Sequence, residues 1–212
     1  MRRICQELNK LETMPPWGRT QGNDWDRKSN FVYRVTMLDA LRRQAVARAK
    51  ADGIDEQAFL AYVIRRWYNH HTHQVIFSML CEHPHIRAEE NPRHHTIDFY
   101  LHDLAFDLKL SRFPRAFPGT VDEAMADPVS LINWQYQQQS REWRYHTANR
   151  FFIIFHHRTK PQLTWQLRRD FDRLKTRLYP YLETPKIIGA KFEDKDGVLR
   201  TPWTCILFYV VD

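Results

Sequence analysis

The segment IDFYLHDLAFDLKL, residues 97–110, decides the fold, because apolar and polar residues alternate on both sides of His102-Asp103. Strict alternation is typical of β-strands, and a two-residue connection predicts a hairpin in which Asp98 faces Asp107. One face of this hairpin is apolar and the other is polar. The apolar face holds Ile97, Phe99, Leu101, Leu104, Phe106, Leu108 and Leu110, and the polar face holds Asp98, Tyr100, Ala105, Asp107 and Lys109.

The polar face of the hairpin predicts a metal site. Opposed carboxylates on neighbouring strands, with Cβ atoms roughly 4.5 to 5.5 Å apart, repel each other unless a cation lies between them. Lys109 follows Asp107 on the same face, so its ammonium can reach a metal-bound water or a phosphate oxygen. Hard oxygen ligands suit Mg²⁺ or Mn²⁺, which polarise phosphoryl oxygens and lower the pKa of bound water. The alternative is an exposed ion pair between Lys109 and Asp107 or Asp98.

Composition limits the class of protein. A chain of 212 residues at 43% hydrophobic content supports a core of ordinary size, so we expect a single domain over residues 1–212. A net charge of +7 favours a polyanionic partner. Cys5, Cys81 and Cys205 are few and far apart, which argues against a disulfide framework. No apolar run is long enough for a bilayer and no signal peptide begins the chain, so we expect a cytoplasmic protein without a membrane partner.

Apolar spacing along the chain predicts an α/β protein. Residues 1–30 are expected to form an N-terminal arm or loop, because Pro, Gly, Asn and Asp recur in them with no apolar period after residue 13. FFIIF, residues 151–155, is typical of a buried central strand. We expect helices over 38–49, 55–80, 128–147 and 163–180, and strands over 97–101, 104–110, 151–155, 186–192 and 204–211.

An acidic residue that opens one strand, followed by Asp-x-Lys on the next, resembles the PD-(D/E)XK nuclease superfamily. The resemblance depends on Asp98, Asp107 and Lys109, and Ile97 stands where the superfamily has proline. A wider stretch is similar to an uncharacterised bacterial group within it: RWYN at 66–69, DFYL at 98–101, FDLKLSRFP at 106–114 and QSREWRYHTANRFF at 139–152. The resemblance implies a restriction-endonuclease-like mixed sheet flanked by helices. It also implies that Asp98 and Asp107 hold Mg²⁺ or Mn²⁺ and that Lys109 positions the attacking water.

The resemblance implies further site residues. Members often add a glutamate from the helix before the hairpin, where this chain has Gln74, a neutral and weaker ligand. Glu82 is the acid we expect to complete the metal shell, in preference to Glu89 or Glu90. A helix after the Asp-x-Lys strand contacts substrate in similar nucleases, and the nucleic-acid-binding candidates here are Gln139, Ser140, Arg144, Asn149 and Arg150.

The sequence therefore predicts a metal-dependent DNA endonuclease acting in restriction, phage defence or mobile-element processing. The choice of DNA over RNA follows from the resemblance alone, and a homodimer or a complex with partner proteins stays open. The alternative is a non-catalytic nucleic-acid-binding protein on a nuclease-like fold. A zinc site made by Cys81, His83 and His85, with His94 or His95 added, is a third hypothesis. Nucleotide hydrolysis of the P-loop type is disfavoured, because the chain has only 6 glycines and no glycine-rich phosphate loop.

Overall fold

The structure, a computed structural model, describes residues 2–16, 18–91, 94, 96–140, 148–193 and 197–212, without the side chains of 139 and 140. The chain forms two compact units, Met1–Ile76 and Phe77–Asp212, and helix α4 (Glu56–Cys81) runs from the first into the second. A single domain over residues 1–212 stays a prediction. None of the helices in the described parts is both long and apolar enough to cross a membrane.

The N-terminal unit is helical. Helix α3 (Leu38–Ala51) buries Leu38, Leu41, Ala45 and Ala49 at helical spacing, and the carboxylate of Asp55 caps α4 by accepting the amide of Ala58 at 2.7 Å. The expected arm is more ordered than the sequence indicates. It carries α1 (Arg2–Asn9) and α2 (Asp24–Lys28), with the 3₁₀ helix η1 (Asn30–Tyr33) directly after it.

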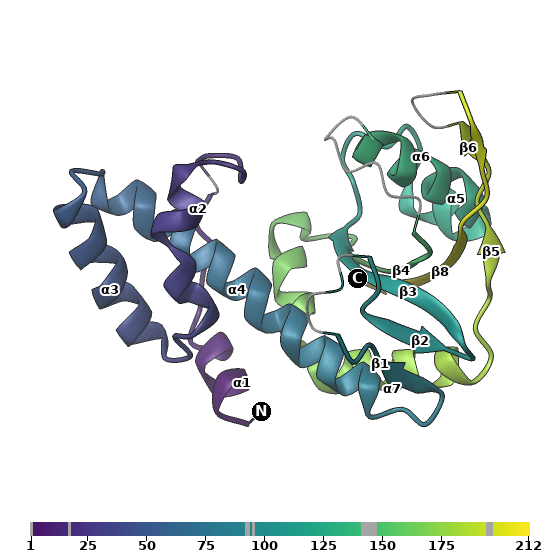
Figure 1. The fold of residues 1–212 in the computed structure, drawn as a ribbon, viewed down its shortest axis with the longest axis horizontal. Helices are drawn as coiled ribbons and strands as arrows, with labels where there is room; N and C mark the ends of the chain where they lie inside the picture. Colours follow the sequence, from purple (N-terminus) through teal and green to yellow (C-terminus); the bar gives the residue numbers. More distant parts are fainter. Residues whose placement is uncertain (1, 17, 92–93, 95, 141–147, 194–196) are drawn as a thin grey trace. The chain divides into compact units, whose positions relative to one another are not determined.

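The C-terminal unit is built on a mixed six-stranded sheet in the order β1-β2-β3-β4-β8-β5 (Figure 1). Strands β3, β4 and β8 are parallel, and the others pair antiparallel. The α/β class with a mixed sheet flanked by helices is thus confirmed. The strands are β1 (Ile86–Ala88), β2 (Phe99–Leu101), β3 (Leu104–Arg112), β4 (Arg150–His157), β5 (Ile188–Gly189) and β8 (Trp203–Val211), and β6 (Phe192–Glu193) with β7 (Leu199–Arg200) forms a separate ribbon.

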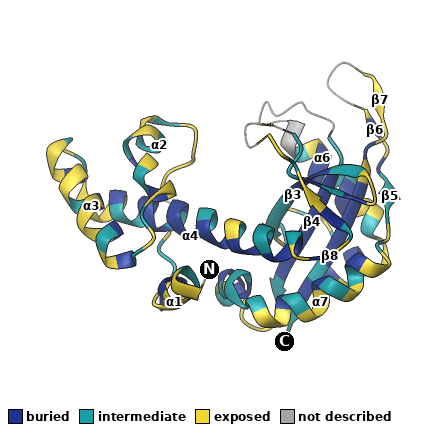
Figure 2. Cartoon of the chain, turned by 60° about the horizontal axis from the view of Figure 1, so that its bottom comes forward, coloured by how far each residue is buried: buried dark blue, intermediate teal, exposed yellow. Residues whose placement is uncertain are grey.

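The predicted hairpin is present in the predicted register. Phe99 pairs with Phe106 and Leu101 with Leu104, so His102 and Asp103 alone form the turn. Both have positive φ, 46° and 67°, as a type I′ turn requires. The FFIIF run is confirmed as a central strand, because β4 pairs on both sides and all five of its residues are buried (Figure 2).

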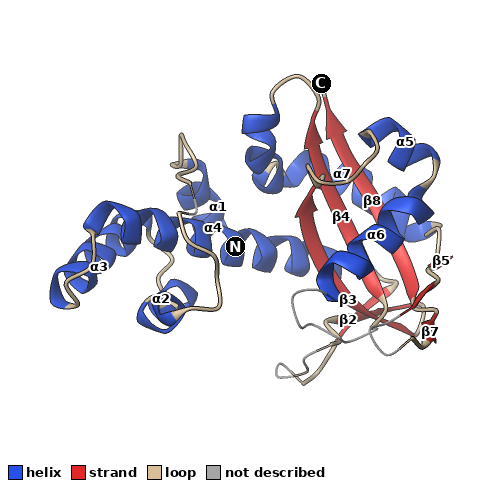
Figure 3. Ribbon diagram, turned by 90° about the horizontal axis from the view of Figure 1, so that it is seen from above, coloured by secondary structure: helices blue, strands red, loops and turns tan. Residues whose placement is uncertain are grey.

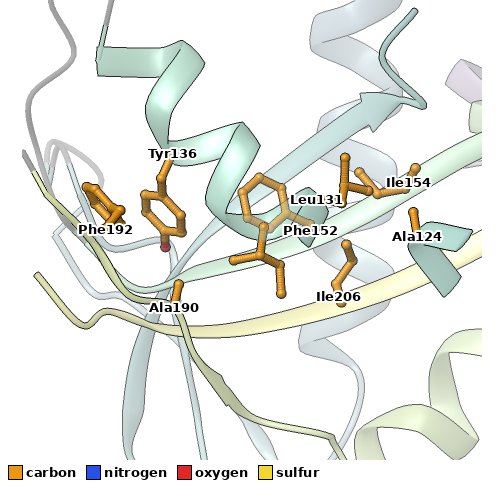
Figure 4. Packing of buried hydrophobic residues seen from close by; sticks show 9 residues of the cluster. Ala124, Leu131, Tyr136, Phe152, Ile154, Ala190, Phe192 and Ile206 are labelled. Atoms are coloured by element: carbon orange, nitrogen blue, oxygen red, sulfur yellow. The ribbon is translucent and has the colours of Figure 1, made fainter. Parts of the chain in front are cut away.

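Helices cover both faces of the sheet. Helices α5 (Val121–Ala126) and α6 (Pro128–Ser140) lie on one face, where Phe152 and Ile154 of β4 pack against Leu131 and Tyr136 of α6 (Figures 3 and 4). Helix α7 (Phe171–Glu183) covers the other face, where Tyr181 meets Phe151 edge to face at 5.8 Å. This two-sided burial explains why β4 is apolar throughout.

One predicted helix differs from the structure, and another is described only in part. The helix expected over 163–180 is two segments, the 3₁₀ helix η2 (Pro161–Arg169) and α7, which separate at Asp170. Helix α7 continues through Pro180 to Glu183, because burial of Leu182 in the core offsets the hydrogen bond that proline cannot donate. Helix α6 is described to Ser140, and the rest of the helix expected to reach 147 lies outside the described residues.

Candidate functional site

The candidate site is centred on Asp107, in the middle of the sheet. The parallel register pairs Asp107 with Arg150 and Lys109 with Phe152, so all four side chains share the face that α6 covers. Lys109 Nζ lies 2.7 Å from Asp107 Oδ1, and Arg150 Nε lies 3.9 Å from Asp107 Oδ2. The side chain of Asp107 is 8% exposed, that of Arg150 1% and that of Lys109 32%. The site is therefore a buried carboxylate between one buried and one partly exposed cation.

The surroundings of Asp107 disfavour the charged form of its carboxylate. Burial raises its pKa above the ordinary aspartate value, and the charge of Asp98 raises it further, while Lys109 and Arg150 oppose the shift. Its Oδ2 atom is buried and has no hydrogen-bond partner among the residues that the structure describes. A buried carboxylate oxygen without a donor is costly unless a further cation binds it. This oxygen has the chemistry of a metal ligand.

Asp98 lies beside Asp107 but is displaced by one residue from the predicted position. Its amide donates to the carbonyl of Phe106 at 2.8 Å, although Phe106 already pairs with Phe99. Two residues opposite one is the pattern of a β-bulge, which re-aims a side chain. The Asp98 carboxylate accepts the backbone amide of Leu108 at 2.7 Å and so lies at the edge of β3. The two acids act on each other electrostatically, as the sequence predicts, without facing each other directly across the strands.

Arg150 is held from the side of α6. Its guanidinium stacks over the ring of Tyr136 at 4.5 Å, and the Tyr136 hydroxyl donates to the carbonyl of Ala148 at 2.9 Å. Burial raises the pKa of Tyr136 to about 12, so this hydroxyl keeps its proton at neutral pH. A permanently charged side chain in this position partly neutralises the Asp107 carboxylate.

Asn149 ties three strands together at the site. Its side chain donates to the carbonyl of Ala105 at 3.0 Å and accepts the amide of Trp203 at 2.8 Å, and its carbonyl accepts the amide of Asp107 at 3.0 Å. Asn149 and Arg150 therefore support the site from within, and their predicted contact with nucleic acid stays a prediction. Of the other candidates for that contact, Arg144 and the side chains of Gln139 and Ser140 lie outside the described residues.

The two candidates for the third ligand have other surroundings in the structure. Gln74 is an exposed residue of α4 in the N-terminal unit. Glu82 accepts hydrogen bonds from Lys175 at 2.7 Å and from the Tyr179 hydroxyl at 3.4 Å, and the bond from Lys175 lowers its pKa. Within the described parts of the chain, no group of three potential ligands includes Asp98 or Asp107, and a role for Glu82 in that shell stays a prediction.

The histidines between residues 70 and 95 separate into distinct groups. His70 packs edge to face on Tyr33 at 4.9 Å in the N-terminal unit, where burial lowers its pKa to about 4. His83 and His85 gather with Glu183 of α7 and form the one potential metal-binding group in the described parts of the chain. Of the zinc ligands drawn from the sequence, Cys81 is not a member, His94 accepts the amides of Thr96 and Ile97 instead, and His95 lies outside the described residues.

Sequence reasoning missed two residues at these sites. Arg150 was expected to contact a ligand, and its role beside Asp107 follows only from the parallel register of β3 and β4. Glu183 carries no local signal that separates it from any other acid at the end of an amphipathic helix. A model of the whole tertiary structure is needed to find both.

Comparisons with known proteins add no relative from which a function can be transferred. No protein family model, no curated protein and no solved structure gives a significant match to this chain.

Proposed function

We propose that this protein is a metal-dependent phosphodiesterase that cleaves DNA on a restriction-endonuclease-like fold. The observation that carries the proposal is the buried Asp107 carboxylate beside Asp98 and Lys109 on adjacent strands, with one oxygen that accepts no hydrogen bond from the described residues. The order of elements supports it, since a helix precedes the three-stranded antiparallel part and a further helix leads to the parallel strand β4. The cytoplasmic location and the DNA partner belong to the same proposal.

The residues present fit Mg²⁺ or Mn²⁺. Asp107 Oδ2 is a buried hard oxygen to which no described residue donates a hydrogen bond, and the Asp98 carboxylate keeps lone pairs beyond the one that accepts Leu108. Asp98 and Asp107 would hold the ion, which when bound polarises a phosphoryl oxygen and makes a bound water more acidic.

The chain's own residues supply positioning and charge. Lys109 is the cation of the site that solvent reaches, so its ammonium is able to meet a phosphate oxygen or orient a water at the scissile bond. Arg150 stays buried and partly neutralises the charge of Asp107.

A non-catalytic nucleic-acid-binding protein explains the net charge of +7 equally well. It does not explain why a carboxylate is buried at the centre of the sheet with one oxygen that accepts no hydrogen bond within the described parts of the chain. An acidic pair repels phosphate unless a cation neutralises it, so the site favours chemistry over simple binding.

The test is a cleavage assay on purified protein with plasmid, single-stranded DNA and RNA, with and without Mg²⁺ or Mn²⁺. We expect metal-dependent cutting of DNA that falls at least about 100-fold in Asp107→Asn and in Lys109→Ala. Asp122→Asn is the matched control, because Asp122 is an exposed aspartate paired with Arg158 away from β3, and it should cut normally. Equal cutting by wild type and both site variants would reveal a contaminating nuclease and overturn the proposal.

A further inference from the structure

A second group of ligand-type side chains lies where α4 and α7 end. His83 and His85 belong to the turn after α4, and Glu183 is the last residue of α7. His83 Nε2 is 3.1 Å from Glu183 Oε1, and His85 Nδ1 is 3.8 Å from Glu183 Oε2. Each carboxylate oxygen therefore faces a different imidazole.

The spacing of these atoms suits one ion. One nitrogen from each histidine and one oxygen from Glu183 all lie within 4.8 Å of one another. Ligands of a tetrahedral zinc ion, bound at about 2.0 to 2.1 Å, are separated by roughly 3.3 Å. Small side-chain rotations thus bring all three atoms to a common centre.

The surroundings restrict two of the three side chains. The side chain of His83 is 1% exposed and stacks edge to face on Tyr179 at 5.1 Å. The ring of His85 packs against His102 of the hairpin turn at 4.6 Å. Glu183 is 57% exposed and His85 34%, so an ion has a path from solvent. Two imidazole rings held in place, with one side open to solvent, are typical of a preorganised binding site rather than of a mobile group of surface side chains.

We propose that His83, His85 and Glu183 bind one divalent transition-metal ion of the zinc class. Two imidazole nitrogens and one carboxylate oxygen are borderline donors that favour Zn²⁺ over Mg²⁺ or Ca²⁺. Three protein ligands leave a fourth position of a tetrahedral ion to water or to a bound group. The ion joins residues about 100 positions apart in the chain and so fixes the end of α7 to the turn that precedes β1.

Binding changes the hydrogen bonds of His83. In the structure its Nδ1 accepts the amide of His85 at 3.3 Å, which leaves the proton on Nε2, facing Glu183. Coordination through Nε2 moves that proton to Nδ1, so the long bond from the His85 amide is lost. The ion forms two bonds to imidazole and one to carboxylate. They replace this bond, the contact of His83 Nε2 with Glu183 Oε1 at 3.1 Å and that of His85 Nδ1 with the carbonyl of Leu182 at 3.4 Å.

The test is titration of chelator-treated full-length protein with Zn²⁺ alone, against a chromophoric chelator, together with the visible absorption of the Co²⁺ form. We expect one Zn²⁺ per chain and a tetrahedral Co²⁺ spectrum. Both should be lost in Glu183→Gln and His85→Gln, with affinity at least about 100-fold weaker. Both replaced residues are partly exposed, so the variants should fold, which circular dichroism checks. Glu193→Gln is the matched control, an exposed acid on β6.

Two results would overturn the proposal directly: no Zn²⁺ uptake by the wild type, or full affinity in Glu183→Gln. A third is loss of Zn²⁺ binding in an Asp107→Asn variant that circular dichroism shows to be folded, because the ion would then belong to the aspartate pair. The inference does not depend on the nuclease proposal. Measuring Mg²⁺-dependent DNA cutting by Glu183→Gln distinguishes the zinc proposal from the nuclease proposal. This cutting should be retained whether or not the protein binds zinc.

Discussion

At the scale of single residues, the pair of Asp107 and Arg150 governs both stability and chemistry. A buried charge is tolerated when a partner lies close, and removing only one partner leaves the other uncompensated. Asp107 Oδ2 and Arg150 Nε are 3.9 Å apart, farther than a hydrogen bond, so the carboxylate is partly neutralised and still keeps an oxygen for a further cation.

Arg150→Met should lower the free energy of unfolding by about 3 to 5 kcal/mol, because Asp107 then has only Lys109 as a cation partner. Adding Asp107→Asn to this variant should restore part of the loss, since the amide needs no cation. Denaturant unfolding of the wild type, both single variants and the double variant measures the coupling. Independent, additive effects would contradict the assignment.

The same variant has a characteristic pH dependence. Because burial raises the pKa of Asp107, the folded state binds a proton more tightly than the unfolded state. The contribution of Asp107 to the free energy of unfolding is fully present below its pKa in the unfolded state. It is lost as the pH rises through its higher pKa in the folded state. Without Arg150 the pKa of Asp107 rises further. The loss of unfolding free energy in Arg150→Met should therefore be small at low pH, and it should grow as the pH rises through the pKa of Asp107 in the folded state.

At the scale of elements, the β2–β3 turn requires a backbone conformation at Asp103 that glycine adopts more readily than aspartate. Asp103 has φ of 67°, a left-handed conformation that glycine adopts freely and β-branched residues avoid. We expect stability to follow the order Asp103→Gly, then wild type, then Asp103→Val, with steps of up to about 1 kcal/mol. Thermal unfolding of the three proteins checks this order. A valine variant as stable as the glycine variant would show that the turn has another geometry.

The elements also show how far sequence reasoning reaches. Alternation over residues 97–110 predicted the hairpin and its turn, and the FFIIF run predicted β4, because periodicity and apolar runs are local signals. The bulge at Asp98, the break at Asp170 and the role of Arg150 were not predictable in this way. Each depends on which segment packs alongside, and the register between β3 and β4 joins residues that more than 40 positions of intervening chain separate.

At the scale of the whole molecule, net charge and the acidic site oppose each other. A charge of +7 attracts a polyanion over a distance of about one Debye length, roughly 8 Å at physiological salt. At the site itself, Asp98 and Asp107 repel the phosphate that a nuclease must bring to within contact. The two effects are reconciled if a divalent cation neutralises the aspartates only when substrate arrives.

The affinity for DNA in the absence of metal therefore reports on the charge of the aspartate pair. In EDTA, Asp107→Asn should bind a labelled duplex about fivefold more tightly than the wild type, because removing one close unit charge lowers repulsion by about 1 kcal/mol. Ca²⁺ is a hard cation that prefers oxygen ligands. In its presence the affinity of the wild type for the duplex should rise, and the difference in affinity between the wild type and Asp107→Asn should become smaller. Asp122→Asn changes the net charge equally but lies on the exposed surface beside Arg158, so it should alter binding less in both conditions. Fluorescence anisotropy at several salt concentrations measures all three proteins. Equal gains in Asp107→Asn and Asp122→Asn would mean that only net charge matters, and DNA would then not approach the aspartate site.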